Sequence, residues 1–134
     1  TDRNATALVG RYESDVEDLF TLYARPQHNG LRTDVHEVTF TNVEGAGLRF
    51  STDSTLHFSA AHHRMEALDP GPDKAAVQSH VRLLEPEAPV FVNIDGFHSG
   101  VGCVNSWGAL PLPEYQLPFG DYRFHYRIEP LLAE

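Results

Sequence analysis

The chain has 134 residues, 41% of them hydrophobic, and its 19 acidic and 10 basic residues give a formal net charge of -9. This length is enough to bury one hydrophobic core without disulfides or metals, while no apolar run is long enough to span a membrane. The negative charge disfavours a nucleic-acid partner, and the single cysteine, Cys103, excludes an intrachain disulfide and a zinc site of several thiolates. We therefore expect one domain over residues 1–134, with no nucleic-acid or membrane partner, in a reducing compartment such as the cytoplasm.

Alternation of apolar and polar residues, the period of a half-buried strand, recurs along the chain. Segments 34–42 and 47–52 show it weakly, and segment 55–61 shows it clearly, with Leu56, Phe58 and Ala60 on one face. The stretch DKAAVQSH, residues 73–80, is the one helical candidate, although a loop fits it equally well. Helix therefore has little room in this chain.

The second half of the chain continues the strand pattern. Segment 80–85 is a weaker strand, and segment 89–96 ends at Asp95-Gly96, which, like Asn29-Gly30, is a turn dipeptide. DYRFHYRI, residues 121–128, is the clearest strand, with Tyr122, Phe124, Tyr126 and Ile128 expected on a buried face. Many short strands separated by Gly, Pro, Asn and Asp turns predict an all-β fold, an antiparallel β-sandwich.

Eight histidines make metal binding worth testing. His62 and His63, with His57 and Glu66 nearby, have residue types that bind zinc. If the pair lies on a strand, its two side chains point to opposite faces, so at most one can share a cavity with His57. Solvated or hydrogen-bonded imidazoles are the favoured interpretation, and no metal ligand is assigned.

Nucleophilic and acid–base catalysis are also weakly indicated. Cys103 with His98 or His80 is a pairing that eight histidines make nearly unavoidable by chance. The acid pairs Asp15 with Glu17 and Glu85 with Glu87 have the residue types that glycosidases use. They lie in polar segments with nothing to raise a carboxyl pKa, so no catalytic residue is assigned.

Trp107, the one tryptophan, lies in GFHSGVGCVNSWGALPLPEY, residues 96–115. The glycines before it and the prolines after it disfavour both a helix and a long strand. Two interpretations are equally weighted. The indole either plugs the edge of the sandwich, or it is a stacking platform for the apolar face of a sugar, to which galactosides are suited.

Three segments carry a resemblance to a known family: YARPQHNGLRTDV, FVNIDGFHSGVGCVNSWG and LPEYQLPFGDYRFHYRI. In this order they resemble the C-terminal domain, called domain 5 or the small-chain domain, of bacterial β-galactosidases of glycoside hydrolase family 2. The resemblance covers nearly the whole chain, from about residue 10. It implies a supersandwich of the galactose-mutarotase-like type, of which residues 1–134 would be the C-terminal half.

The resemblance also implies a role for Trp107. In the family the catalytic centre lies in a separate TIM barrel, and a loop of the small-chain domain brings one tryptophan to the rim of the galactoside pocket. The family pattern maps onto Asn105, Ser106, Trp107 and Gly108, so Trp107 is the expected substrate-binding residue and Asn105 and Ser106 are its loop neighbours. Neither catalytic glutamate is expected in this chain.

Cofactors and partners follow from the same resemblance. No cofactor is expected in this chain, while magnesium and sodium are implied for the full enzyme, bound by upstream domains. The expected partners are those domains, the galactoside substrate and further copies of the full enzyme in a homo-oligomer. Cys103, His28 and the pair His36-Glu37 depart from the family pattern. A non-glycine residue at 103 is unfavourable if the loop requires positive φ there.

A second hypothesis is an autonomous carbohydrate-binding or scaffold module without catalysis. A β-sandwich that presents one tryptophan from a loop suits that use as well. Gene context distinguishes the two, because an upstream reading frame of about 900 residues with a TIM barrel favours the β-galactosidase.

Overall fold

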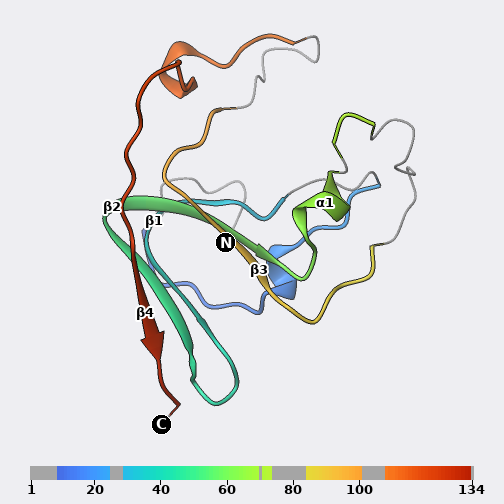
Figure 1. Cartoon of the computed structure of the whole chain (residues 1–134), viewed down its shortest axis with the longest axis vertical. Coiled ribbons are helices and arrows are strands. Elements are labelled where there is room, and N and C mark those ends of the chain that lie inside the picture. Colours follow the sequence, from blue (N-terminus) through green and yellow to red (C-terminus); the bar gives the residue numbers. More distant parts are fainter. Residues whose placement is uncertain (1–8, 25–28, 70, 74–83, 101–107, 134) are drawn as a thin grey trace. The chain divides into compact units, whose positions relative to one another are not determined.

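The computed structural model describes residues 9–24, 29–69, 71–73, 84–100 and 108–133 (Figure 1). The chain divides into two compact units. The first unit comprises Thr1–Gly30 and Ser59–Val92, and the second comprises Leu31–Phe58 and Asn93–Glu134. The strands β2 and β3 each continue from one unit into the other along the chain.

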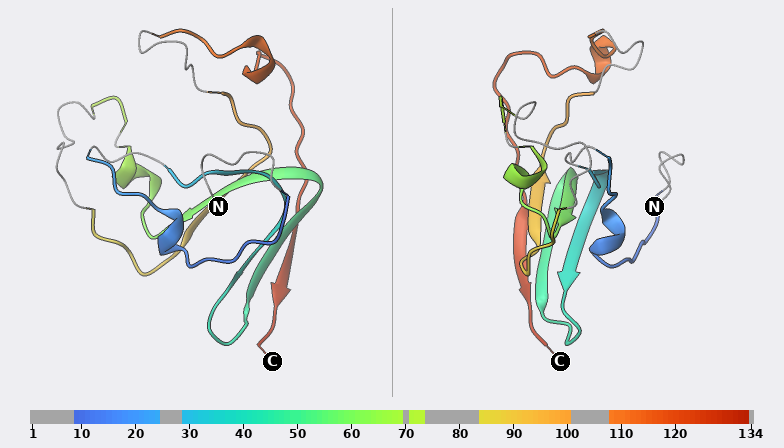
Figure 2. Two further views of the ribbon diagram at one scale, coloured as in Figure 1. Left: turned by 180° about the vertical axis from the view of Figure 1, so that it is seen from behind. Right: turned by 90° about the vertical axis from the view of Figure 1, so that its right-hand side faces the viewer.

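Four strands form one sheet: β1 (Arg32–Thr41), β2 (Gly47–Ala61), β3 (Phe91–Asp95) and β4 (Arg127–Leu131). Its order is β1-β2-β3, and β4 pairs with β2 as well. Both β1 and β4 run antiparallel to β2. Figure 2 shows the strands in two further views. The described helices are short: α1 (Met65–Leu68) and the 3-10 turns η1 (Glu17–Leu19) and η2 (Pro113–Tyr115).

This architecture confirms the all-β class and the antiparallel pairing. The weak strand predicted at 34–42 is β1, and the segments 47–52 and 55–61 are two parts of the single strand β2. Strand β3 confirms the prediction at 89–96, but it pairs with β2, so Asp95-Gly96 does not close a hairpin. The described residues form a single sheet, and the second layer of a sandwich stays a prediction.

Two predicted elements fall largely outside the described residues. These are the helix candidate at 73–80 and the strand at 80–85, which overlap residues 74–83. The turn prediction at Asn29-Gly30 is confirmed, because Gly30 has φ +78° and a Cβ there would lie 2.5 Å from the carbonyl oxygen of Leu19. Asn29 reinforces the turn with two hydrogen bonds to the backbone of Thr21.

The period of two in β2 correctly predicts the core. Leu56, Phe58 and Ala60 are all buried, and Leu56 has no exposed surface. In the second unit, the ring of Phe40 on β1 meets the rings of Phe50 and Phe58 edge to face, with centroids 6.1 and 5.8 Å apart. Cross-strand aromatic and aliphatic pairs therefore hold β1 against β2.

The prediction for residues 121–128 is wrong in both extent and burial. Strand β4 begins only at Arg127, and Tyr122, Tyr126 and Ile128 are each about half exposed. Residues 121–126 are not in the sheet. The Thr52 hydroxyl donates to the carbonyl of His125 at 2.8 Å, a side-chain bond rather than a ladder bond. Period two shows which side chains share a face, whereas burial also requires a second layer to cover that face.

In the first unit, the segment after residue 84 is fastened to the end of β2. The N–H of Glu87 donates to the carbonyl of His62 at 2.7 Å. The Arg64 guanidinium donates to both carboxylate oxygens of Glu87, at 2.6 and 2.5 Å, and lies 5.5 Å from the ring centroid of Phe91. This two-pronged geometry is the stronger form of the Arg–carboxylate pair.

Replacing Leu56 with Ala is expected to destabilise the chain by about 2 to 5 kcal/mol, because it removes buried methyl groups and leaves a cavity. The measurement is the free energy of unfolding from urea denaturation. Val43→Ala is the control, since Val43 lies in an exposed turn, and it should change the free energy by less than about 0.5 kcal/mol. Equal effects of the two substitutions would contradict the assigned core.

Acid is expected to weaken the attachment of the segment around Glu87 to Arg64, which follows the end of β2. The hydrogen bonds from Arg64 lower the pKa of the Glu87 carboxyl, and Glu87 raises the pKa of Arg64 in return. Because the folded pKa of Glu87 is depressed, its contribution is present above the ordinary glutamate pKa and is lost as the pH falls through the depressed value. The hydrogen-exchange protection factors of residues 84–90, which are corrected for the intrinsic pH dependence of amide exchange, should fall below about pH 4. Glu87→Gln should remove that acid dependence, and an unchanged dependence would refute the role of the pair.

Candidate functional site

The predicted substrate-binding residue Trp107, with Asn105 and Ser106, lies outside the described residues, as do Cys103 and His80. The structure does describe the residues that flank this loop on both sides, up to Gly100 and from Gly108 onward. All of them belong to the second unit. The candidate site is therefore described through the residues at the two ends of this loop.

The N-terminal end of the loop is fastened to η2. The N–H of Gly100 donates to the carbonyl of Tyr115 at 2.6 Å. A Cβ at position 100 would lie 2.7 Å from the Cβ of Tyr115, so only glycine fits this approach. Gln116 donates its side-chain amide to the carbonyl of Pro111 at 2.6 Å and braces the same turn.

The C-terminal end of the loop has its own conformational requirement. Gly108, directly after Trp107, has φ +88°, in a region that disfavours side chains. The Trp-Gly dipeptide of the family pattern thus has a physical basis at its second residue. Any side chain at 108 would strain the backbone of the residue that follows Trp107 in the sequence.

Aromatic rings from segment 121–126 support the chain just before the loop. The rings of Phe97 and Tyr122 lie 5.1 Å apart, and those of Phe124 and Tyr126 stack at 5.3 Å. A Cβ at Gly96 would lie only 2.3 Å from the ring of Phe124, so the ring rests directly on the glycine backbone. The alternating aromatics that the sequence predicted to be a buried strand face are instead part of the loop's support.

Sequence analysis missed this supporting role. The sequence does show a glycine at position 96 and a run of alternating aromatic residues after position 120. Nothing in either segment, however, identifies the other as its partner. Only the fold brings them together. These supporting residues are Gly96, Phe97, Gly100, Tyr115, Tyr122 and Phe124.

His98, considered as a base for Cys103, lies beside His57, with ring centroids 6.5 Å apart. The N–H of Asp34 points to Nδ1 of His57 at 3.4 Å, which places the proton of a neutral His57 on Nε2. Asp34 has φ +57°, the left-handed conformation that aspartate tolerates better than most residues. Among the described residues, no further His, Cys, Asp or Glu lies where it would complete a metal-binding group with these two imidazoles.

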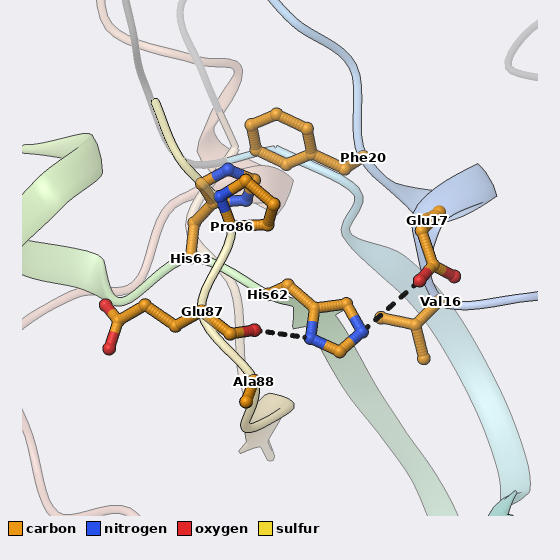
Figure 3. Close-up of a pocket in the computed structure, with 8 residues that line it drawn as sticks. All are labelled: Val16, Glu17, Phe20, His62, His63, Pro86, Glu87 and Ala88. Carbon is orange, nitrogen blue, oxygen red and sulfur yellow. Dashed lines mark hydrogen bonds and ion pairs between the residues drawn. The ribbon is translucent and has the colours of Figure 1, made fainter. Parts of the chain in front are cut away.

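A pocket of about 430 Å³ lies within the first unit (Figure 3). Apolar and titratable side chains share its wall, namely Val16, Glu17, Phe20, His62, His63, Pro86, Glu87 and Ala88. His62 donates from Nδ1 to the carbonyl of Glu87 at 2.9 Å, and its Nε2 lies 3.5 Å from the Glu17 carboxylate. The ring of His63 stacks on Phe20 at 4.3 Å.

The strand geometry assumed for the histidine pair is wrong. Strand β2 ends at Ala61, so His62 and His63 lie in the bend that follows, and both line the pocket. His57 belongs to the other unit. The Nδ1–H of His62 donates to a backbone carbonyl, as the hydrogen-bonded interpretation predicts, and Nε2 faces the Glu17 carboxylate, with which it forms an ion pair in the protonated ring. In the described part of the chain, no group of three or more His, Cys, Asp or Glu residues is placed to hold a metal ion.

The acidic residues of this pocket are not arranged for glycoside chemistry. A general acid needs a raised carboxyl pKa, whereas Arg64 lowers the pKa of Glu87. Glu17 faces His62 instead of a second carboxylate (Figure 3). The pocket therefore joins the first unit's segments by hydrogen bonds and ring stacking, and its two carboxylates, Glu17 and Glu87, each face a basic side chain.

Within the described ranges, the model has no helix with the length and apolar character needed to cross a bilayer. This finding agrees with the short helices of the fold.

Comparison with known proteins places the chain in a family. The model of the family described as "Beta galactosidase small chain" matches residues 1–128. The chain is 32% identical to a β-galactosidase of Leuconostoc mesenteroides and 33% identical to one of Lactococcus lactis, over 93% and 95% of its length. It is 34% identical to a β-galactosidase of Yersinia pestis over 79% of its length.

These relatives are much longer proteins. The aligned part of the chain spans 11% of the Leuconostoc and Lactococcus proteins and 9% of the Yersinia protein. The resemblance drawn from the three sequence segments is therefore confirmed at the level of the family. The chain belongs to the β-galactosidase small-chain family, and it spans about a tenth of the length of the relatives it matches.

Proposed function

We propose that this chain is the C-terminal β-sandwich part of a retaining β-galactosidase of glycoside hydrolase family 2. The enzyme would hydrolyse terminal β-D-galactosides such as lactose. The observation that carries the proposal is the family match over residues 1–128, together with relatives named β-galactosidase of which the chain spans about a tenth. That share also favours an enzyme part over an autonomous binding module.

The role proposed for Trp107 is to stack against the substrate at the rim of a pocket built by a separate TIM barrel. Asn105 and Ser106 would shape the loop beside it. The base of the loop supports this role, because the hydrogen bond of Gly100 to Tyr115 and the packing of Phe124 on Gly96 limit where the loop can begin. A rigid base reduces the entropy lost when a loop residue binds a ligand.

The bond-breaking chemistry is assigned to the rest of the polypeptide. A retaining glycosidase needs two carboxyl groups about 5 Å apart, one as nucleophile and one as acid/base. The carboxylates of Glu17 and Glu87 are instead occupied by His62 and Arg64. This chain's contribution would be substrate contact through Trp107 and a surface for the neighbouring domains.

Magnesium and sodium are proposed for the complete enzyme and are assigned to its upstream domains. Among the residues that the structure describes, no group of three or more His, Cys, Asp or Glu is placed to hold a metal ion. We further propose a cytoplasmic, homo-oligomeric enzyme, in which residues 1–134 form the C-terminal half of the small-chain domain.

The chain alone is expected to be inactive on a nitrophenyl β-galactoside, because it lacks the carboxylate pair. The assay compares the purified 134-residue chain with the complete enzyme at equal molar concentration. Glu17→Gln and Glu87→Gln are the controls for any residual rate. Hydrolysis that persists in the purified chain and disappears with either substitution would contradict the proposal.

Trp107→Ala in the complete enzyme is expected to raise KM by about tenfold or more, with a smaller loss of kcat. Stacking on an apolar sugar face contributes to ground-state binding as well as to the transition state, and loss of such uniform binding appears in KM. The measurement is steady-state kinetics with lactose on enzyme of confirmed fold.

Substitutions of graded chemistry at Trp107 provide the control for that experiment. Phe and Tyr keep a smaller stacking face and should recover part of the loss, while Leu keeps apolar bulk without a ring and should not. An unchanged KM for Trp107→Ala would mean that the indole plugs the sandwich edge and does not contact substrate.

A further inference from the structure

A column of aromatic rings connects the core of the sheet to the residues just before the Trp107 loop. Phe50 on β2 is buried, and its ring centroid lies 6.4 Å from that of Tyr126. The ring of Tyr126 stacks on that of Phe124 at 5.3 Å. Phe124 in turn lies against Gly96, the residue that directly follows β3. We call Phe50, Tyr126 and Phe124 the aromatic column.

The ring of Phe124, and not the backbone conformation, makes glycine necessary at position 96. Gly96 is not among the glycines with positive φ, so its backbone conformation is one that residues with side chains also adopt. A Cβ there would lie 2.3 Å from the Phe124 ring, and the heavy atoms nearest to it all belong to that side chain. Such close packing leaves the backbone little room to shift. The aromatic column therefore fixes the point where the chain leaves β3.

Side chains hold the segment that carries Phe124 beside the sheet. Strand β4 begins only at Arg127, so this segment is not part of the strand ladder. The Thr52 hydroxyl of β2 donates to the carbonyl of His125 at 2.8 Å. Phe124 is half-buried and Tyr126 is 45% exposed. Incomplete burial contributes less to global stability than a fully buried ring does, so the column fixes a position more than it stabilises the fold.

We propose that Phe124 is a positioning residue for the substrate contact made by Trp107. This inference rests on the proposed function. Gly100 is held by its bond to Tyr115, and Gly96 by the Phe124 ring, so the chain is fixed at two points before the loop. Stacking requires the indole at a defined place, and a displacement of about 1 Å can cost up to about 100-fold in rate.

A double-mutant cycle in the complete enzyme tests this role. Phe124→Leu keeps apolar bulk without the flat ring, and it is expected to raise KM for lactose about fivefold, with a smaller loss of kcat. The rise should not exceed that of Trp107→Ala, because Phe124 acts only through the indole. In the Trp107→Ala background, Phe124→Leu should change KM by less than about twofold, since no indole remains to be positioned.

Two substitutions of phenylalanine are the controls. Phe124→Tyr keeps the ring on Gly96 and should retain the KM of the unsubstituted enzyme. Phe119→Leu makes the same chemical change at a fully exposed phenylalanine and should leave KM unchanged. A rise in KM that is specific to loss of the ring at 124 would support the positioning role.

Thr52→Val covers the case in which Phe124→Leu does not fold. It replaces the hydroxyl by a methyl group and removes the hydrogen bond to the carbonyl of His125. The expected rise in KM is about threefold, the usual effect of losing one such bond. This rise should also disappear in the Trp107→Ala background. Thr52→Ser keeps the donor and is the matched control.

The cycle separates the possible outcomes. A rise in KM by the same factor with and without the indole would mean that the column is structural support only, and would overturn the inference. Unchanged KM for Phe124→Leu and Thr52→Val, beside a raised KM for Trp107→Ala, would also overturn it and leave the proposed function intact. An unchanged KM for Trp107→Ala would instead refute the proposed role of Trp107, on which the inference rests.

Discussion

Close backbone approach at strand β2 is the constraint on which the rest of the described structure depends. The N–H and C=O groups of a strand need partners along its length, and β2 pairs with all three other strands of the sheet. At its start, a Cβ on Gly47 would lie 1.8 Å from the carbonyl oxygen of Phe40, so glycine is required for β1 to pair there. The side chains of β2 then supply most of the buried core, including Leu56 and Phe58.

The same use of glycine recurs at the candidate site. Gly96 and Gly100 both occupy positions where a Cβ would overlap an aromatic residue, Phe124 and Tyr115 respectively. These close contacts attach the residues just before the Trp107 loop to segments that come later in the chain. The contacts at 96 and 100 therefore hold the base of the loop that we propose contacts substrate against two segments outside the sheet.

Two of the histidines, His62 and His63, have structural roles in the first unit. His62 uses its ring nitrogens to join the end of β2 to residue 87 and to Glu17, and His63 stacks on Phe20. Imidazole suits such positions because the ring can donate hydrogen bonds and stack on an aromatic side chain.

The sequence alone determined the fold class, the strands in β1, β2 and β3, and the core positions 56, 58 and 60. It also determined the family, because three ordered segments are a far more specific signal than composition. These properties follow from local alternation and from residue identity. Tertiary structure decided the rest: residues 121–126 support a loop instead of extending a strand, and His62 and His63 share a pocket because β2 ends before them. Periodicity determines which side chains lie together on a face, whereas burial and partnership depend on which distant segment packs against that face.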